Sequence, residues 1–330
     1  MKSIWALRSG TRGLAAFAVC AAGALAAQEA PGVDTPRPDR VAWMEIFPEP
    51  LPSGRSGLAL EFTSQFLRPD RATSGDERTR AVLQGEEWQL TGDFSAPLLG
   101  GYINVRLRAV TRSGGIADQF LVTYHTFLGT PGGGRELAPK DQFHYRLERD
   151  GTVVVDLKKP DTVIMEPDIA WVKPFGTKEV GGRFGLSIQL PTGKRENFTG
   201  TGRAAGLVGG AIWKVTGPWH GFAQTERVFF SLPEDSPYKA VLTQRAFTRA
   251  WVGGGYQGEG VGFFSGLGIE LSLGYLENPY HVDLPRVDKD GLQQHWTLTH
   301  KRLPRWRFGL SEEAGSYFAP DITVFAGYRF

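Results

Sequence analysis

The last ten residues of the chain, 321–330, constrain its fold more than any other segment. Counted back from the end, every second side chain is apolar, and these five residues are Phe330, Tyr328, Ala326, Val324 and Ile322. Side chains alternate across a strand, so the pattern predicts one strand with a wholly apolar face. A transmembrane β-barrel closes such a strand against its first strand and turns the apolar face to lipid.

The same ending is typical of the signal by which bacterial outer-membrane β-barrels are recognised for assembly. Tyr328 lies two residues before the C-terminal Phe330, and we predict that the two form this barrel-assembly signal. The expected location is therefore the bacterial outer membrane. The expected partners are the barrel-assembly machinery, outer-membrane lipids and lipopolysaccharide.

The first 26 residues predict a secretory signal peptide. Three bases precede a short apolar run at 14–22, and Ala24 and Ala26 provide small residues for cleavage. The run is too short to span a bilayer as a helix. An uncleaved anchor is the alternative, and a lipoprotein is disfavoured because Cys20 lies within the apolar run.

The composition after this cleavage excludes several classes of function. The sequence has 37 Lys and Arg against 35 Asp and Glu, and three of the bases lie in residues 1–26, so 34 bases remain against 35 acids. This balance gives no basis for nucleic-acid binding. The single cysteine, Cys20, leaves with the signal, so the mature chain has no thiol for a disulfide, a metal site or catalysis.

The remaining chain is predicted to have two parts. Residues 27–55 are rich in proline and are interpreted as an extended periplasmic or lumenal segment. Residues 56–330 show period-two stretches between turn residues, which predict an all-β, antiparallel transmembrane barrel of about twelve strands, with ten or fourteen as alternatives. One strand is expected over 81–94. An insertion at about 113–166 interrupts the rhythm and contains a hairpin with an Asp-Gly turn at 150–151.

One stretch indicates which side chains face lipid. In residues 102–108 the odd-numbered residues from Ile103 are apolar, whereas Asn104, Arg106 and Arg108 share the opposite face. A charge on the lipid face costs about 2–4 kcal/mol at mid-membrane, so strand arginines are expected in the lumen or near the headgroups. The candidate lumen residues are Arg106, Arg108, Arg245, Arg249 and Arg329. A basic lumen favours anions. The alternative is a filled interior in which these arginines pair with Glu61, Glu226 and Glu270.

Six tryptophans near the expected strand ends predict an aromatic girdle. Amphipathic rings favour the headgroup level of the membrane, so these side chains are expected on the outer face. They are Trp171, Trp213, Trp219, Trp251, Trp296 and Trp306.

No arrangement of residues predicts the chemistry of an enzyme. None of the six histidines has the Gly-x-Ser-x-Gly context of a serine hydrolase. Tyr124-His125 near Asp118 is more simply a polar cluster in the insertion. The Asp-rich segment 288–291 lacks the ligand spacing of a calcium loop. We therefore predict no catalytic, cofactor-binding or metal-binding residues, no cofactor and no enzymatic activity.

Several short pieces occur in a recognisable order. They are Tyr-His-Thr-Phe-Leu-Gly at 124–129, Gln-Leu-Pro-Thr-Gly at 189–193, Leu-Ser-Glu-Glu at 310–313, Pro-Asp-Ile-Thr-Val at 320–324 and the Tyr-Arg-Phe end. Together they resemble a family of proteobacterial outer-membrane proteins defined only as domain of unknown function 3187. The Leu-Pro-Thr-Gly piece is also distantly similar to the outer-membrane family linked to phenol meta-pathway degradation, whose members are described as transporters. The resemblance implies the barrel fold and its location, and says little about activity.

These observations favour a channel or carrier for a small solute, with the insertion folded into or over the pore. The alternatives are a barrel-embedded enzyme that acts on lipid or lipopolysaccharide, and a structural barrel that conducts nothing. Conduction requires an open lumen, and the enzyme requires a Ser–His or paired-carboxylate site at the rim. A structural barrel requires a plugged lumen and neither kind of site.

Overall fold

The wall of the molecule is a closed ring of antiparallel strands. The computed structural model describes residues 46–52, 57–67, 70–73, 78–115, 119, 122–123, 126–127, 142–194, 197–259, 265–282, 284, 288–314 and 320–330. Among these residues, twelve strands form the ring. They are β1 (Gly57–Leu67), β4 (Glu86–Leu98), β5 (Gly101–Ser113), β9 (Asp168–Gly176), β10 (Val180–Gln189), β11 (Ala205–Thr216), β12 (Trp219–Phe230), β13 (Ala246–Glu259), β14 (Ser265–Leu276), β15 (Gly291–His300), β16 (Trp306–Ala314) and β17 (Pro320–Arg329). The predicted signal peptide lies outside the described residues.

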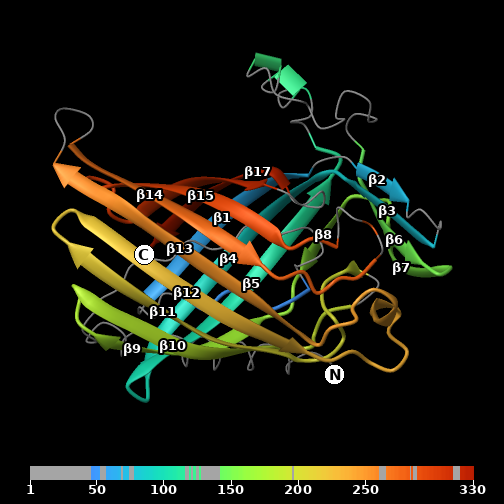
Figure 1. The fold of residues 1–330 in the computed structure, drawn as a ribbon, viewed down its shortest axis with the longest axis horizontal. Coiled ribbons are helices and arrows are strands. Elements are labelled where there is room, and N and C mark those ends of the chain that lie inside the picture. The colour runs from blue at the N-terminus through green and yellow to red at the C-terminus, as the bar shows by residue number, and fades with distance from the viewer. Residues whose placement is uncertain are drawn as a thin grey trace, which may run out of the picture.

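The ring closes because β4 pairs with both β1 and β5 (Figure 1). From β1 the order runs through β17, β16, β15, β14, β13, β12, β11, β10 and β9 to β5. The C-terminal strand lies against the first strand, with Tyr328 opposite Leu60. The amide of Phe330 then donates to the carbonyl of Leu58 at 2.9 Å. The predicted antiparallel barrel of about twelve strands is confirmed.

The connections give the barrel two different ends. Short turns lie at one end, at residues 99–100, 177–179, 217–218 and 301–305. Longer connections lie at the other, including residues 190–204, 231–245 and 277–290. We call these the turn end and the loop end; β1 starts and β17 finishes at the turn end. No helix in the described part of the chain is long and apolar enough to cross a membrane.

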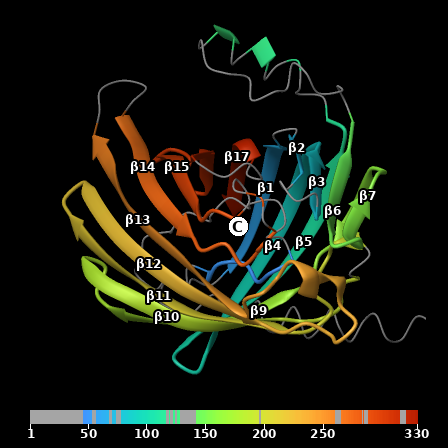
Figure 2. The same cartoon turned by 45° about the vertical axis from the view of Figure 1, so that its right-hand side comes forward.

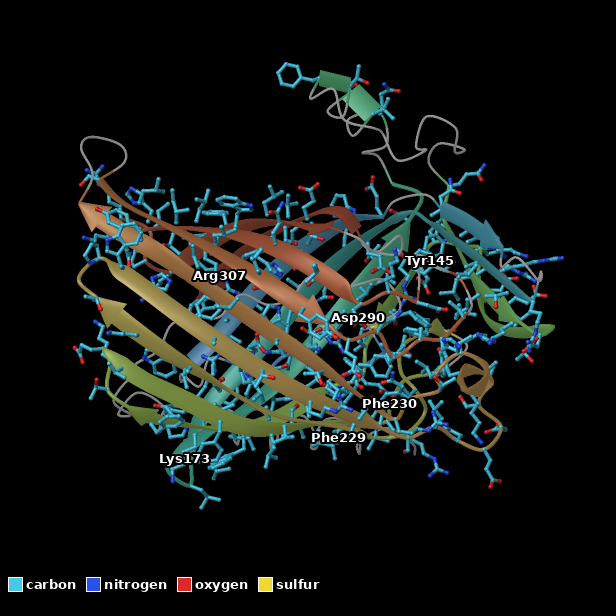
Figure 3. All side chains as sticks on the ribbon, in the orientation of Figure 1. Tyr145, Lys173, Phe229, Phe230, Asp290 and Arg307 are labelled. Atoms are coloured by element: carbon cyan, nitrogen blue, oxygen red, sulfur yellow. The ribbon has the colours of Figure 1, made fainter. Side chains whose placement is uncertain are left out.

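The two faces of the wall differ in polarity as the alternation predicts. On β5, Arg106 and Arg108 are buried inside, whereas Leu107 is exposed outside. Adjacent residues of β12 show the same division, since Phe229 lies on the outer face and Phe230 on the inner face (Figure 3). Each wall strand exposes at least one large apolar side chain: Leu60, Leu90, Leu107, Phe175, Leu186, Ile212, Phe229, Val252, Leu273, Leu298, Phe308 and Val324. The outside of the ring is therefore an apolar band.

A second sheet lies at the loop end and departs from the predicted wall. Its strands, in order, are β2 (Asp70–Thr73), β3 (Thr79–Gln84), β6 (His144–Arg149) and β7 (Thr152–Leu157). The prediction of one strand over 81–94 is wrong, because β3 belongs to this sheet and β4 to the wall. Gly85, with a φ of +138°, separates them. A Cβ there would lie 2.7 Å from the carbonyl oxygen of Ser113, so the break requires glycine.

The described part of the insertion contributes to this second sheet and to the wall. β6 and β7 form the predicted hairpin, and Asp150 and Gly151 both have positive φ in its turn. β8 (Asp161–Ile164) pairs with residues 109–112 of β5, near the loop end. The insertion is thus tied to the barrel by strand pairing on one side and to β3 on the other.

The largest apolar core lies at the loop end. Phe230 and Phe247 of the wall pack there with Tyr238 of the 3-10 helix η4 (Pro237–Ala240). Tyr145 of β6 belongs to the same cluster, and Figure 3 labels it at this end with Phe230. The long connections therefore fold inward into a packed cap instead of projecting separately.

The predicted aromatic girdle is only partly correct. Trp219, Trp296 and Trp306 are exposed on the outer face. However, Trp213 and Trp251 point inward and form a buried cluster with Phe222. Their positions share the inner parity of β11 and β13, so alternation, and not proximity to a strand end, decides their face.

Candidate functional site in the barrel lumen

Residues 46–52, which we call the lumenal segment, lie inside the barrel (Figure 2). Ile46, Phe47 and Leu51 are buried. The Phe47 ring centroid lies 4.8 Å from that of Phe230 and 5.0 Å from that of Phe247. The segment is therefore continuous with the apolar core at the loop end.

The backbone of the lumenal segment is held from nearly opposite sides of the ring. Arg106 of β5 donates to the carbonyl of Pro50 at 3.0 Å, and Arg249 of β13 donates to the carbonyl of Pro48 at 3.0 Å. The amide of Leu51 donates to Glu226 Oε1 at 2.8 Å. β5 and β13 are five positions apart in the ring of twelve strands. The segment thus crosses the lumen.

Glu49 supplies the charged contact of the segment. Its Oε1 lies 3.0 Å from Arg108 Nη1, and its Oε2 lies 3.7 Å from Arg106 Nη1. Its amide donates to Asp168 Oδ2 at 3.4 Å. With its amide oriented to satisfy both neighbours, Gln189 donates to the carbonyl of Ile46 and accepts from Arg108. All these side chains are buried, so each interaction acts in a medium of low dielectric constant.

Strand register explains why these charges meet. Asp93 of β4 and Asp168 of β9 are the cross-strand neighbours of Arg106 on its two sides. The Arg106 Nε donates to Asp93 Oδ1 at 2.6 Å. On the other side of the lumen, Arg249 lies opposite Glu226 in the register, with 3.1 Å between Nη2 and Oε2. Oppositely charged cross-strand neighbours on the inner face therefore form ion pairs.

One further arginine joins this group through an amide. Arg183 donates to Gln224 Oε1 at 3.0 Å, and Gln224 donates to Glu226 Oε1 at 2.6 Å. We use the name wall cluster for the buried charged residues of the wall around the lumenal segment. They are Arg106, Arg108, Arg183, Arg249, Asp93, Asp168 and Glu226.

The five arginines that the sequence predicted to face the lumen separate into three groups. The structure places Arg106, Arg108 and Arg249 together around the lumenal segment. Arg329 lies at the turn end of β17, on the inner parity, and its amide donates to the carbonyl of Arg305. Arg245 precedes β13 and is exposed, with bonds to carbonyls of its own loop.

Sequence reasoning did not single out the segment's own acid or its partners Asp168 and Gln189. Glu49 is the only charge within the apolar, proline-rich run 46–52, and this isolation was the available signal.

Arg112 and its acidic partners hold a further loop, nearer the loop end than the lumenal segment. Arg112 of β5 donates to the carbonyls of Asn197 and Phe198, at 2.9 and 3.1 Å. Its cross-strand neighbours are Glu87 and Asp161, which lie 3.3 and 3.5 Å away. Phe198 is buried and has a φ of +52°, a conformation that costs energy for a side chain of this size. The connection between β10 and β11 is therefore drawn into the mouth.

Glu166, just before β9, anchors the same loop. The amide of Gly193 donates to its Oε1 at 3.1 Å, and its Oε2 is buried without a hydrogen-bond partner. Burial raises the pKa of Glu166 to about 7, against the opposing effects of the Gly193 amide and Arg108. The ionised form is thus disfavoured in the docked loop.

Polar side-chain pairs at the turn end have a different geometry. His220 Nε2 lies 2.6 Å from Glu270 Oε2, and Gly255 stands between them in the register. Arg307 Nη2 lies 2.6 Å from Glu61 Oε2, with Gly327 between them in the register. Each pair spans one intervening strand, and at Gly255 the absence of a side chain leaves room for the pair.

The enzyme and metal-site alternatives depend on other residues. Tyr124, His125 and Asp118 lie outside them. No group of acidic, histidine or cysteine side chains among the described residues has the arrangement of a metal site. His295 faces Ser272 across the ladder to β14, but both are buried on the inner face, away from a lipid at the rim.

Comparison with known protein families bears on the resemblance that the sequence motifs indicated. Residues 74–229 match the family described as "Protein of unknown function (DUF3187)", which confirms the predicted resemblance. No curated protein sequence matches the chain.

Several solved structures are similar. The COG4313 outer membrane channel from Pseudomonas putida F1 has 11% identity and a TM-score of 0.46, covering 85% of this chain and 97% of that one. The NanC porin has 8% identity and a TM-score of 0.41, covering 82% and 98%. The CymD monoaromatic hydrocarbon channel has 8% identity and a TM-score of 0.36, covering 83% and 89%. The family description states no activity.

Proposed function

We propose that this protein is an outer-membrane channel or carrier for a small solute, and that its own lumenal segment closes it in this conformation. The observation that carries the proposal is the path of residues 46–52, which cross the lumen between β5 and β13. The segment takes part in no strand of the wall. It therefore fills the pathway that a solute would take without being part of the barrel.

The outer face supports the membrane location. Every wall strand presents a large apolar side chain outward, while charged residues are concentrated inside. In outer-membrane barrels the short turns are periplasmic and the long loops are extracellular. The turn end then faces the periplasm, and the cap built from 142–167 and the long connections closes the extracellular mouth.

The contacts of the lumenal segment suit a removable closure. A hydrogen bond to a charged group contributes about 1.5–3 kcal/mol net, because water replaces the lost partner when the bond opens. The segment makes such bonds through Pro48, Pro50 and Leu51, whereas the wall strands are joined along their whole length. Release of the segment can occur without opening the sheet.

Single-channel recording in planar bilayers tests the proposal. The full chain is expected to be mostly closed, with brief openings. Glu49→Ala removes the ion pairs to Arg106 and Arg108 and should increase the open fraction. Glu234→Ala changes an exposed acid on the outer connection and should behave like the unsubstituted chain.

A structural barrel is the second candidate, favoured by the filled lumen. If the unsubstituted chain and Glu49→Ala both conduct nothing in correctly folded, inserted barrels, the channel proposal is contradicted and the structural function is supported. Solute-dependent opening is expected only for a channel or carrier.

The assembly signal remains part of the proposal. Tyr328 packs against Phe330 and Trp306 on the outer face, with ring centroids 4.8 and 4.9 Å apart. Deleting Phe330 should lower the amount of folded, heat-modifiable barrel in outer-membrane fractions. Undiminished amounts would show that assembly reads another feature.

A further inference from the structure

The carboxylate of Glu49 occupies a site with the geometry of an anion receptor. Its two oxygens face two different guanidinium groups, at 3.0 Å for Arg108 and 3.7 Å for Arg106. Both arginines project from the same face of β5, two residues apart, and both are buried. Guanidinium groups bind carboxylates well because their planar N–H groups match the two oxygens.

The balance of charge shows what an occupant must carry. The wall cluster contains four arginines and three acids, and Glu49 supplies the fourth acid. Glu166 also faces Arg108 and Asp168, but with a pKa of about 7 it carries only part of a charge at neutral pH. Buried charges need partners, so departure of Glu49 leaves a cationic excess. A replacement for Glu49 must therefore be anionic.

The neighbouring contacts add a second requirement. Arg106 and Gln189 donate to backbone carbonyls of the segment on either side of Glu49, at Pro50 and Ile46. Each of these two donors loses one acceptor when the segment leaves. An occupant with acceptor oxygens beside its carboxylate satisfies them, whereas a simple halide satisfies neither.

From this geometry we propose that the lumen contains a carboxylate-binding site at Arg106 and Arg108, which Glu49 occupies in the closed state. The solute of the channel is then a small organic carboxylate, and it opens the path by taking the place of Glu49. This inference rests on the proposed function and names its substrate class.

Chemical rescue of Glu49→Ala tests the site in the full chain. The substitution removes the terminal methylene and carboxylate, and acetate supplies a carboxylate of similar size. Thermal unfolding is followed by heat-modifiable migration at constant ionic strength in acetate, in chloride and in chloride with acetamide. Acetate should raise the unfolding midpoint of Glu49→Ala above its value in the other two solutions. The unsubstituted chain, whose site is filled, should show no such rise.

A second variant locates the effect. Adding Arg108→Gln to Glu49→Ala should abolish the acetate-specific rise. Equal midpoints in acetate, chloride and acetamide would overturn the proposal, as would an equal acetate-specific rise in the unsubstituted chain. The comparison between Glu49→Ala and the unsubstituted chain can be made even if the double variant fails to fold.

Conductance separates the two proposals. A Glu49→Ala barrel that conducts but shows no acetate-specific stabilisation contradicts the carboxylate site and leaves the channel. A barrel that is stabilised by acetate and never conducts contradicts the channel and supports the binding site.

Discussion

The two ends of the lumen use charged residues for different purposes. At the turn end, the pairs His220–Glu270 and Arg307–Glu61 join strands of the wall to each other. At the loop end, the wall cluster binds the lumenal segment, which lies outside the sheet. The turn-end partners are kept close by the ladders on either side of the intervening strand. The segment at the loop end depends on side-chain contacts alone among its described interactions.

This difference indicates which half of the barrel can change state. Breaking a turn-end pair leaves both strands in place, because their backbone hydrogen bonds remain. Breaking the contacts of the lumenal segment frees a length of chain that fills the lumen. We therefore expect the turn end to be a stable frame and the loop end to carry the closure.

The largest expected effect is the loss of a buried arginine at the loop end. Arg106→Met leaves Asp93 and Glu49 without this cation and should lower the free energy of unfolding by about 3–5 kcal/mol. Arg307→Met is the turn-end control, and it should lower the free energy of unfolding less, because the Arg307 side chain is 20% exposed whereas that of Arg106 is 2% exposed. Denaturant titration of barrels folded in lipid vesicles measures both. Equal losses would remove the proposed distinction between the ends.

A change on the outer face tests the wall that both ends share. Val105→Arg should lower the free energy of unfolding by about 2–4 kcal/mol if the residue lies near mid-membrane. Asn104, its inward neighbour, donates to Ser95 Oγ at 2.7 Å, so Asn104→Ala should cost only about 1 kcal/mol. If Asn104→Ala lowered the free energy of unfolding more than Val105→Arg in the same vesicles, the inner and outer faces of β5 would be the reverse of those described.

Gly255, between His220 and Glu270, tests how tightly this pair is packed at the turn end. A Cβ at Gly255 would lie 2.5 Å from His220 Cε1 and 2.6 Å from the carbonyl oxygen of Ile269. Gly255→Ala should therefore cost about 1–3 kcal/mol through overpacking. At Gly221 the nearest atom would be 3.7 Å away, so Gly221→Ala is the matched control and should be tolerated. Two equally tolerated variants would mean that the pair does not need the glycine.

The most local expected effect is a pH dependence confined to one loop of the cap. The pKa of Glu166 is raised from its ordinary value of 4.5 to about 7 when the loop is docked. Its protonated form therefore stabilises docking fully below pH 4.5, and this contribution is lost as the pH rises to about 7. Hydrogen exchange at the Gly193 amide, corrected for the intrinsic rate, should show more frequent opening at pH 7 than at pH 5. Glu166→Gln should abolish the difference, and an unchanged pH dependence in that variant would assign it to another group.

Local alternation was sufficient to predict much of the wall. Residues 102–108 revealed their inner and outer faces, because in a strand the face depends only on the parity of the position. The same reasoning failed at Gly85, where two strands of different sheets follow each other with a single residue between them. Nearness to a strand end predicted the wrong face for Trp213 and Trp251, whereas parity places both rings inside.

The sequence by itself determined the class of fold, the apolar closing strand and the presence of arginines on inner faces, because each follows from neighbours along the chain. Only the tertiary structure decided what those arginines bind. Glu49 meets Arg108 across 59 positions of sequence, and its amide meets Asp168 across 119. Closure of the ring brings such distant residues to one level of the lumen, and the partner of a buried charge depends on that closure.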